Sequence, residues 1–322
     1  MARLYTALIG LSLIWGMSFV FIKWLVEPAG VWGTVFLRCL AGALVLLPIF
    51  FIQRKREGKK PLPLWKLLVV GIGNAALPWT LIALSETQIN SNTASILNAT
   101  TPIWTGLVGF LFFSVVLTGF QWIGIAVGFI GILVLMNFEV SGIFSSDFVG
   151  VGTMILATMS YAFASQFTKK YLAGTSVVVI STFQLLIGAA FGFVGMIVTD
   201  PISIGDLASG EVILGILGLG CLGSGVATLL YFYIMTNGSP EFASTVTYLI
   251  PGTAMIWGFV LLREPVTHNL ILGLLIIFAG VFLSSRKSKK NHHIPAGRDK
   301  VRPLNKRLIS MLNPLSCKGR GH

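Results

Sequence analysis

The sequence predicts an all-α integral membrane protein in which ten transmembrane helices form two inverted five-helix repeats. Hydrophobic residues make up 55% of the 322 residues and charged residues only 11%, whereas a soluble domain carries about 25% charged residues. Apolar runs of roughly 20 residues recur along the chain, and each is long enough to cross a hydrocarbon core of about 30 Å as a helix. The runs are continuous rather than alternating, which favours helices over barrel strands.

Polar residues, proline and glycine divide the chain into ten candidate spans. The connections between them are short, so consecutive helices are expected to be antiparallel neighbours. The first span leads directly into others and lacks a small-residue cleavage site, so we expect a retained helix rather than a signal peptide. The predicted spans are residues 6–24, 32–52, 64–84, 93–113, 121–138, 149–168, 177–198, 212–234, 242–262 and 269–285.

The charges between the spans predict the orientation of the chain. Cytoplasmic loops carry an excess of Lys and Arg, so we expect a multi-pass protein of the plasma membrane with both termini in the cytoplasm. Only Lys23, Arg38 and Arg263 are basic residues on or near the outer side. The inner side then holds Arg3, Arg54, Lys55, Arg56, Lys59, Lys60, Lys66, Lys169, Lys170 and the tail, and the outer side holds Glu27, Glu86, Glu139, Asp147, Asp200, Asp206, Glu211 and Glu264.

The net charge of +12 does not indicate a nucleic-acid partner, because 11 of the 23 Lys and Arg residues lie in the tail from Arg286 to His322. Charge beside membrane helices explains this pattern, and we expect the cytoplasmic tail, residues 286–322, to be disordered. Cysteines and histidines lack the spacing of a disulfide framework or a metal site, so we predict no metal and no cofactor. A G-x-G-x-x-G run at residues 218–223 lies inside an apolar span, where glycines serve helix packing. No nucleophile–base pair is evident, so we predict that the protein is not an enzyme.

The two halves of the chain share a repeat. When residues 93–136 are placed on 242–285 without a gap, nine positions are identical. Most of them are glycine, proline or small residues, which set how closely helices approach each other in lipid. Five helices per copy is an odd number, so the second copy enters the membrane from the opposite side, an arrangement found in secondary transporters. The earlier helices correspond at an offset of 146, which pairs Trp15 with Tyr161, Lys23 with Lys169 and Arg38 with Gln184.

Several short motifs occur in a specific order. The first copy has Ile14-Trp15-Gly16, Leu37-Arg38, and Ala94-Ser95 followed by Pro102, Gly124 and Gly131, and the second has Ala243-Ser244, Pro251 and Arg263-Glu264-Pro265. With these motifs the chain resembles the drug/metabolite transporter superfamily, in the branch with two EamA-type domains, over residues 5–285. The resemblance implies a ten-helix transporter of small metabolites, often an exporter, with a central cavity between EamA-like repeats at residues 1–138 and 148–285. The sequence departs from the family at Val115, where the first copy lacks the acid that the second has as Glu264.

The solute site of an inverted repeat is expected near the middle of the membrane, between the halves. Arg38 is costly to bury there and would bind a carboxylate or another anion; alternatively it snorkels outward or pairs with Glu86 or Glu27. Aromatic and amide side chains within the spans would line the cavity, or else serve helix packing and helix–helix hydrogen bonds. The cavity candidates are Trp15, Arg38, Asn74, Trp79, Asn98, Trp104, Tyr161, Gln184, Tyr231 and Tyr248.

Two prolines and two acids are the remaining candidates. Pro102 and Pro251 occupy the same register in the two copies, and each leaves a backbone carbonyl free about one turn earlier. They would act in gating, or as plain kinks for packing. Glu86 and Glu264 lie at helix ends on the outer side. They are possible coupling groups, although Glu264 also has Arg263 and His268 as local partners.

These features predict a secondary transporter that moves amino acids or related amphipathic metabolites by alternating access, in the direction of export. Its expected partners are a small-molecule solute and the lipid bilayer, and both a monomer and a homodimer remain open. Transport would be either facilitated or coupled through the terminal acids. Two other classes stay as alternatives, a membrane receptor or assembly component without transport, and a lipid flippase.

Overall fold

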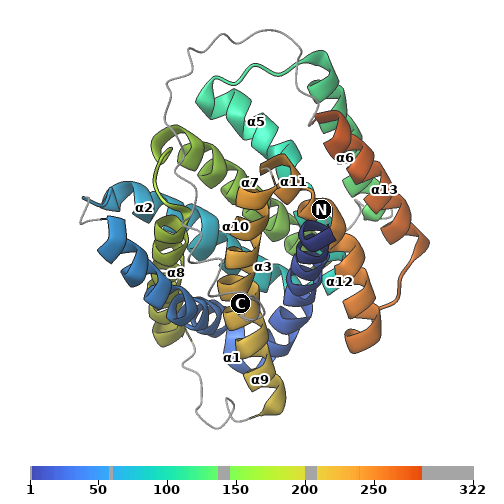
Figure 1. The fold of residues 1–322 in the computed structure, drawn as a ribbon. Helices are drawn as coiled ribbons and strands as arrows, with labels where there is room; N and C mark the ends of the chain where they lie inside the picture. Colours follow the sequence, from blue (N-terminus) through green and yellow to red (C-terminus); the bar gives the residue numbers. More distant parts are fainter. Residues whose placement is uncertain (1, 58–60, 137–145, 200–208, 239, 285–322) are drawn as a thin grey trace, which may run out of the picture.

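The computed structural model describes residues 2–57, 61–136, 146–199, 209–238 and 240–284, and within these ranges the fold is all-helical (Figure 1). The first half contains α1 (Ala2–Glu57), α2 (Leu64–Gly71), the π-helical η1 (Ile72–Ala76), α3 (Leu77–Glu86), α4 (Ser91–Asn98), α5 (Thr101–Phe113) and α6 (Gly119–Leu135). The second half contains α7 (Ser146–Tyr171), α8 (Val177–Thr199), α9 (Gly210–Gly215), the π-helical η3 (Ile216–Val226), α10 (Ala227–Asn237), α11 (Pro240–Ser244), α12 (Val246–Leu262) and α13 (His268–Ser284). The predicted disordered tail, residues 286–322, lies outside the described residues.

The apolar spans are confirmed, but their number is not. By length and composition, six helices of the described chain are able to cross a membrane, or seven if α4 and α5, bent by 41°, count as one span. Two differences explain why ten spans are not recovered. The 56-residue α1 counts once, although its length of about 84 Å far exceeds one crossing; Gly30, with φ 64° and ψ 178°, breaks it. The helices α6 and α13 have only 17 residues each.

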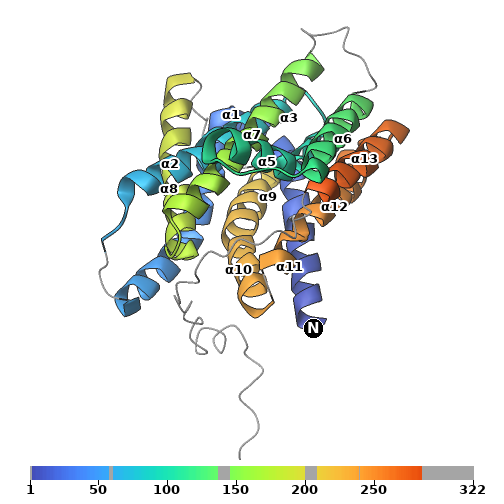
Figure 2. The ribbon, with the colours of Figure 1, turned by 90° about the horizontal axis from the view of Figure 1, so that it is seen from above.

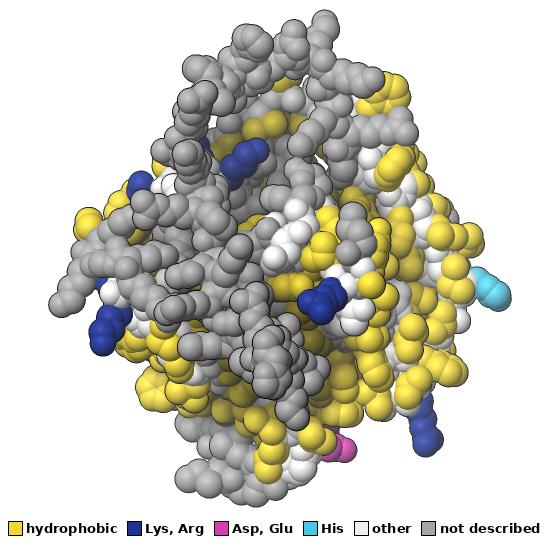
Figure 3. Space-filling model, viewed as in Figure 1, with side chains coloured by type: hydrophobic (Ala, Val, Ile, Leu, Met, Phe, Trp, Pro, Cys, Tyr) yellow, Lys and Arg dark blue, Asp and Glu magenta, His cyan; other side chains and the backbone are white. Residues whose placement is uncertain are grey.

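Hydrophobic side chains make up much of the described surface that is visible in Figure 3. Large apolar residues such as Phe112 and Val198 are 66% and 77% exposed. A soluble protein rarely presents so much contiguous apolar surface. The surface therefore fits a hydrocarbon environment, which agrees with the composition.

The two halves of the chain interlock. The long α1 of the first half packs against α8, η3 and α12 of the second half. The first long helix of the second half, α7, packs in return against α3 and α5. Helices of both halves therefore contribute to the packing between them.

The helix ends gather into two groups. At the acidic end, defined by Leu25, Glu86, Gly150, Gly215 and Glu264, the Leu25 side chain lies against Gly215, and the Ser85 hydroxyl donates to the carbonyl of Gly150 at 2.7 Å. The basic end is defined by contacts of Gln53 with Ser176 at 2.9 Å and of Lys66 with the Tyr171 carbonyl at 3.2 Å. Glu86 and Glu264 thus lie at one end, together with the basic residues Lys23 and Arg263, whereas Lys66 lies at the other end. The end that faces the cytoplasm stays a prediction.

The α6–α13 pair forms a glycine seam, in which the two helices lie side by side in both ribbon views (Figures 1 and 2). A methyl group at Gly124 would lie 2.6 Å from the Gly280 carbonyl oxygen, and one at Gly131 would lie 3.2 Å from that of Gly273. The order of these contacts makes the helices antiparallel. A shift of 149 residues maps Gly124 onto Gly273 and Gly131 onto Gly280. Each of the two contacts is therefore mapped onto the other. The pair therefore has local two-fold symmetry about an axis perpendicular to both helices.

Other features of the backbone also repeat. Ser114 ends α5 with φ 58°, and Arg263 ends α12 with φ 54°, again 149 residues apart. The π-helical segments η1 and η3 begin at Ile72 and Ile216, in helices that correspond in the two halves. Such segments are frequent at functional sites.

The two prolines behave differently in the structure. Pro102 stands in the first turn of α5, just after the 41° bend from α4. Pro251 instead lies inside the continuous helix α12, and the break in that region comes earlier, at Thr245. The common register of the prolines therefore does not give them a common break.

Candidate functional site

Arg38 stands between the two halves on α1. Its guanidinium carbon lies 3.8 Å from the centroid of the Trp79 ring, which belongs to α3. Its Nε donates to the Ser224 hydroxyl of η3 at 3.1 Å. An aromatic face and a hydroxyl hold a cation without neutralising it. The half-buried Arg38 is thus held by neutral partners from both halves, instead of by the predicted alternatives Glu86 or Glu27.

Further aromatic side chains extend this arrangement. Tyr161 on α7 lies close to both Trp79 and Arg38. The Trp15 indole donates to the Gly223 carbonyl at 3.0 Å, and its ring lies 5.7 Å from that of Tyr231 on α10. Because Gly223 precedes Ser224 in η3, this contact adjoins the Arg38 site. We define the central cluster as Trp15, Arg38, Trp79, Tyr161, Ser224 and Tyr231.

Asn74 and Gln184 form a hydrogen-bonded pair between η1 and α8. The Asn74 amide donates to Gln184 Oε1 at 2.8 Å, and the Gln184 amide donates to the Asn74 carbonyl at 3.4 Å. Each half-buried amide thus meets much of its hydrogen-bonding need within the protein. This geometry matches the alternative interpretation of these residues, helix–helix pairing.

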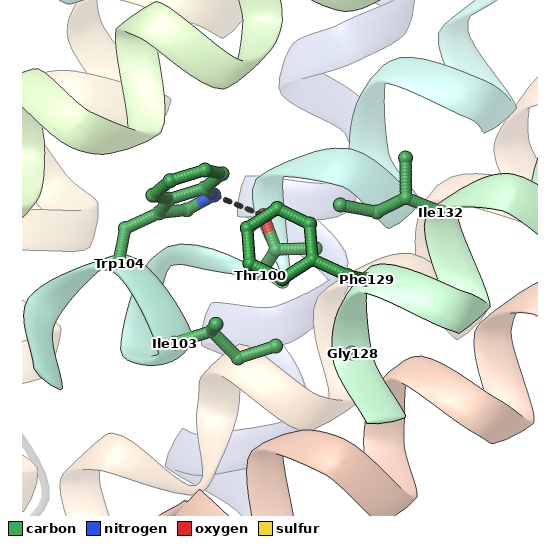
Figure 4. Close-up of a pocket in the computed structure, with 6 residues that line it drawn as sticks. All are labelled: Thr100, Ile103, Trp104, Gly128, Phe129 and Ile132. Carbon is green, nitrogen blue, oxygen red and sulfur yellow. Dashed lines mark hydrogen bonds between the residues drawn. The ribbon is translucent and has the colours of Figure 1, made fainter. Parts of the chain in front are cut away.

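The remaining three cavity candidates, Trp104, Tyr248 and Asn98, have other surroundings. The Trp104 indole donates to the Thr100 hydroxyl at 3.2 Å, and its ring lies 5.2 Å from that of Phe129 (Figure 4). These residues line a crevice between α5 and α6 that is too narrow for a water molecule. Tyr248 packs on Phe278 of α13, with ring centroids 5.9 Å apart. Asn98 leaves a buried side-chain oxygen without a hydrogen-bond partner.

Glu264 connects the two halves at the acidic end. One carboxylate oxygen accepts from the Ser91 backbone N–H at 2.8 Å, and the other from the Ser91 hydroxyl at 2.9 Å and the Asn92 N–H at 3.0 Å. Asn90 caps the next free N–H, that of Thr93, at 2.7 Å. An anion at a helix N-terminus is stabilised by the helix dipole as well as by these donors. Glu264 therefore serves as an N-terminal cap of α4 supplied by the opposite half, rather than as a partner of Arg263 or His268.

Glu86 is buried close to this cap. It is 0% exposed, and both of its carboxylate oxygens lack a hydrogen-bond partner. The Lys23 ammonium donates to the backbone carbonyls of Glu86 and, at 2.8 Å, of Ile89. The two acids thus have different surroundings, because Glu264 is fully engaged and Glu86 is not.

Sequence reasoning missed Ser224, Gly223, Ser91 and Asn92. Ser224 and Gly223 lie in a glycine-rich stretch that was interpreted as packing only. Ser91 and Asn92 stand directly after Asn90, and this run of capping residues ahead of an apolar segment indicates a helix start. This run of capping residues is the sequence signal from which the contact with Glu264 could have been expected.

An apolar bundle of two interlocked helical halves, with a cationic and aromatic cluster between them, defines a membrane protein of duplicated architecture. The EamA-like transporter family matches residues 3–137 and 148–286, so the chain belongs to that family. The match covers both halves, as the repeat predicted.

Similar proteins include transporters from several microbes. The chain is 24% identical over 290 residues to the "Uncharacterized transporter YoaV" of Bacillus subtilis, across 88% of this chain and 97% of that protein. It is 27% identical to the "Uncharacterized inner membrane transporter YedA" of Escherichia coli K12, across 88% and 91%. Protein PecM of Dickeya dadantii is 24% identical, across 85% and 93%. A solved crystal structure with a TM-score of 0.60 and 15% identity covers 88% of this chain and 97% of its own, which shows the fold alone.

Proposed function

We propose that this protein is a secondary transporter that carries amino acids or related amphipathic metabolites out across the plasma membrane by alternating access. The single observation that carries the proposal is Arg38, a cation held between the halves by neutral partners from α3 and η3. A guanidinium whose partners among the described residues are neutral is able to take a solute carboxylate. The aromatic rings of the central cluster would cover the apolar part of the same solute.

The proposed topology is ten spans in two inverted repeats, residues 1–138 and 148–285, with both termini in the cytoplasm. The count follows if α1 is divided at Gly30 into two crossings, each long enough for the hydrocarbon core. The antiparallel glycine seam of α6 and α13 supports the inversion, because its two-fold axis is perpendicular to the helices. An axis in the membrane plane is the hallmark of inverted repeats.

Glu264 is the proposed gate at the acidic end. Its contacts with Ser91 and Asn92 join the second half to α4 of the first. A solute path to this end would have to break them. The first copy has Val115 instead of an acid at the corresponding position, so we expect no cap of this kind at the basic end, which would open more readily. Pro102 and Pro251 are then proposed to shape the bending of α5 and α12 during this exchange.

Glu86 is the better candidate for coupling to protons. A buried carboxylate without a donor is costly, and intramembrane acids commonly belong to proton relays. Replacement of Glu86 by Gln should abolish the effect of a pH gradient on transport, whereas Glu264→Gln should keep that effect. If a pH gradient drives transport equally in both variants, neither acid is the coupling group. Transport would then be facilitated or coupled through another group.

Transport itself is tested with the full chain in proteoliposomes. We expect uptake or exchange of at least one member of a panel of radiolabelled amino acids. Arg38→Gln should abolish it, Arg38→Lys should retain a small part, and the exposed control Lys169→Gln should match the unaltered protein. If every transported solute is carried equally well after Arg38 is replaced, the assigned site is refuted. Movement of labelled lipid between leaflets, without solute flux, would favour the flippase alternative.

A further inference from the structure

The last two helices of the second half form a groove that is wider than the crevice between those of the first half. The groove between α12 and α13 has a volume of about 380 Å³, within the range of about 300–1,000 Å³ found for small-molecule sites. The corresponding pair, α5 and α6, leaves a crevice too narrow for water (Figure 4). The groove is lined by Gly252, Met255, Ile256, Phe259, Val266, Ile271, Leu274 and Leu275.

One sequence difference accounts for much of this contrast. Gly252 corresponds to Ile103 at the offset of 149. Ile103 fills its own crevice so closely that a methyl group at Gly128 would overlap it. A methyl group at Gly252 would meet nothing within 4 Å. The second half therefore has open space where the first half has an isoleucine.

The lining favours hydrocarbon as the occupant. Every lining side chain is apolar, and Ile256, Phe259 and Leu275 are 57%, 61% and 58% exposed. A polar solute would find no hydrogen-bond partner among these side chains, and burying polar groups unpaired is costly. Since the chain is a membrane protein, lipid is the hydrocarbon that reaches this face.

The turn at the end of the groove adds a charge preference. Arg263 and His268 are both exposed and flank the turn that carries the lining residue Val266. The acid between them, Glu264, is engaged with Ser91 and Asn92 of the first half. The turn therefore presents basic side chains outward. Arginine is well suited to bind phosphate through paired N–H groups.

We propose that the α12–α13 groove binds an anionic phospholipid, with an acyl chain along Gly252 to Val266 and its phosphate at Arg263 and His268. The site is separate from the central cluster and does not depend on the transported solute. The first half, with Ile103 in place of Gly252, would lack it.

The test is native mass spectrometry of the full-length protein, after exchange with mixed micelles that contain equal phosphatidylglycerol and phosphatidylcholine. We expect one phosphatidylglycerol per chain to be retained, with a preference over phosphatidylcholine of about tenfold. Gly252→Leu should remove the retained lipid, whereas Gly152→Leu, at another position with nothing within 4 Å, should leave it. Arg263→Gln should keep a bound lipid but lose the preference.

Three results would overturn the proposal. Retention of the lipid by Gly252→Leu would exclude the groove. Equal retention of both lipids by the unaltered protein would exclude the phosphate contact. A change in oligomeric mass with Gly252→Leu would identify a second copy of the chain as the occupant. Because each variant is compared at equal monodispersity and helical content, misfolding is recognised separately.

Discussion

Removal of the Glu264 carboxylate should release the acidic end of the protein. The change is Glu264→Ala, which deletes three hydrogen bonds to Ser91 and Asn92. A hydrogen bond to a charged group contributes about 1.5–3 kcal/mol when buried. Glu264 is only half-buried, so water would replace part of the loss.

We therefore expect the closed arrangement to lose about 2–3 kcal/mol relative to an open one, which is about 30- to 150-fold in the ratio of the two. The mechanism is specific to the cap, because Asn90 still accepts from Thr93 and α4 keeps part of its N-terminal capping. Glu264→Gln should have a smaller effect, since an amide retains one acceptor oxygen but loses the charge.

The assay is the labelling rate of a cysteine placed behind the cap. Ser95, one turn after Ser91 on α4, is 0% exposed, and Ser95→Cys in a cysteine-free background would report opening. A membrane-impermeant maleimide should label this cysteine at least about tenfold faster in Glu264→Ala. Thr87 is exposed at the same end, so Thr87→Cys should be labelled equally fast with and without Glu264→Ala.

A matched control replaces Glu27, an exposed acid at the same end, by Ala. It should leave the Ser95→Cys rate unchanged. If the labelling rates of Ser95→Cys with and without Glu264→Ala differ by less than twofold, the idea that the cap holds the halves together is refuted. An equal acceleration in Glu27→Ala would assign the effect to surface charge instead.

Three further outcomes follow from the packing. Gly124→Ala should lower the Tm through about 1–3 kcal/mol of overpacking against Gly280, while Gly119→Ala, which meets nothing within 4 Å, should not; equal melting of the two by differential scanning fluorimetry would contradict the tight seam. Asn74→Ala should cost about 1–3 kcal/mol because Gln184 loses its partner, and the double replacement of Asn74 and Gln184 by Leu should recover most of the Tm; no recovery would mean that the amides act independently. Trp15→Phe keeps the aromatic ring but loses the hydrogen bond to Gly223, so it should weaken solute affinity more than thermal stability; transport kinetics and Tm that fall together would assign Trp15 to the fold alone.

The overall character of the fold could be predicted from the sequence. The apolar runs and the shared glycines indicated a duplicated helical membrane protein, and the family match covers both copies. The glycines at 124, 131, 273 and 280 were informative because close backbone contact in lipid requires that residue type. The number of spans was harder to predict, since a break such as Gly30 and helices of 17 residues depend on local backbone geometry.

The candidate site was only partly predictable. Arg38 and Trp79 are brought together, and a lone charge and a mid-span aromatic were reasonable signals for that. Trp104 and Tyr248 lie against Phe129 and Phe278 instead. Which face of a helix an aromatic side chain occupies depends on its neighbours in three dimensions. The Glu264 contact with α4 joins residues 172 and 173 positions apart, and periodicity carries no information about such a pair.

The most direct test of alternating access is a pair of distance measurements by spin labels in the same liposome preparation. One pair would stand at the acidic end, at Thr87 and Thr267, and the other at the basic end, at Lys66 and Lys169. We predict that a transported solute shifts the two distance distributions in opposite directions, so that one end closes as the other opens. Distributions that stay fixed at both ends, or that widen together, would contradict a transporter built from two halves rocking around Arg38.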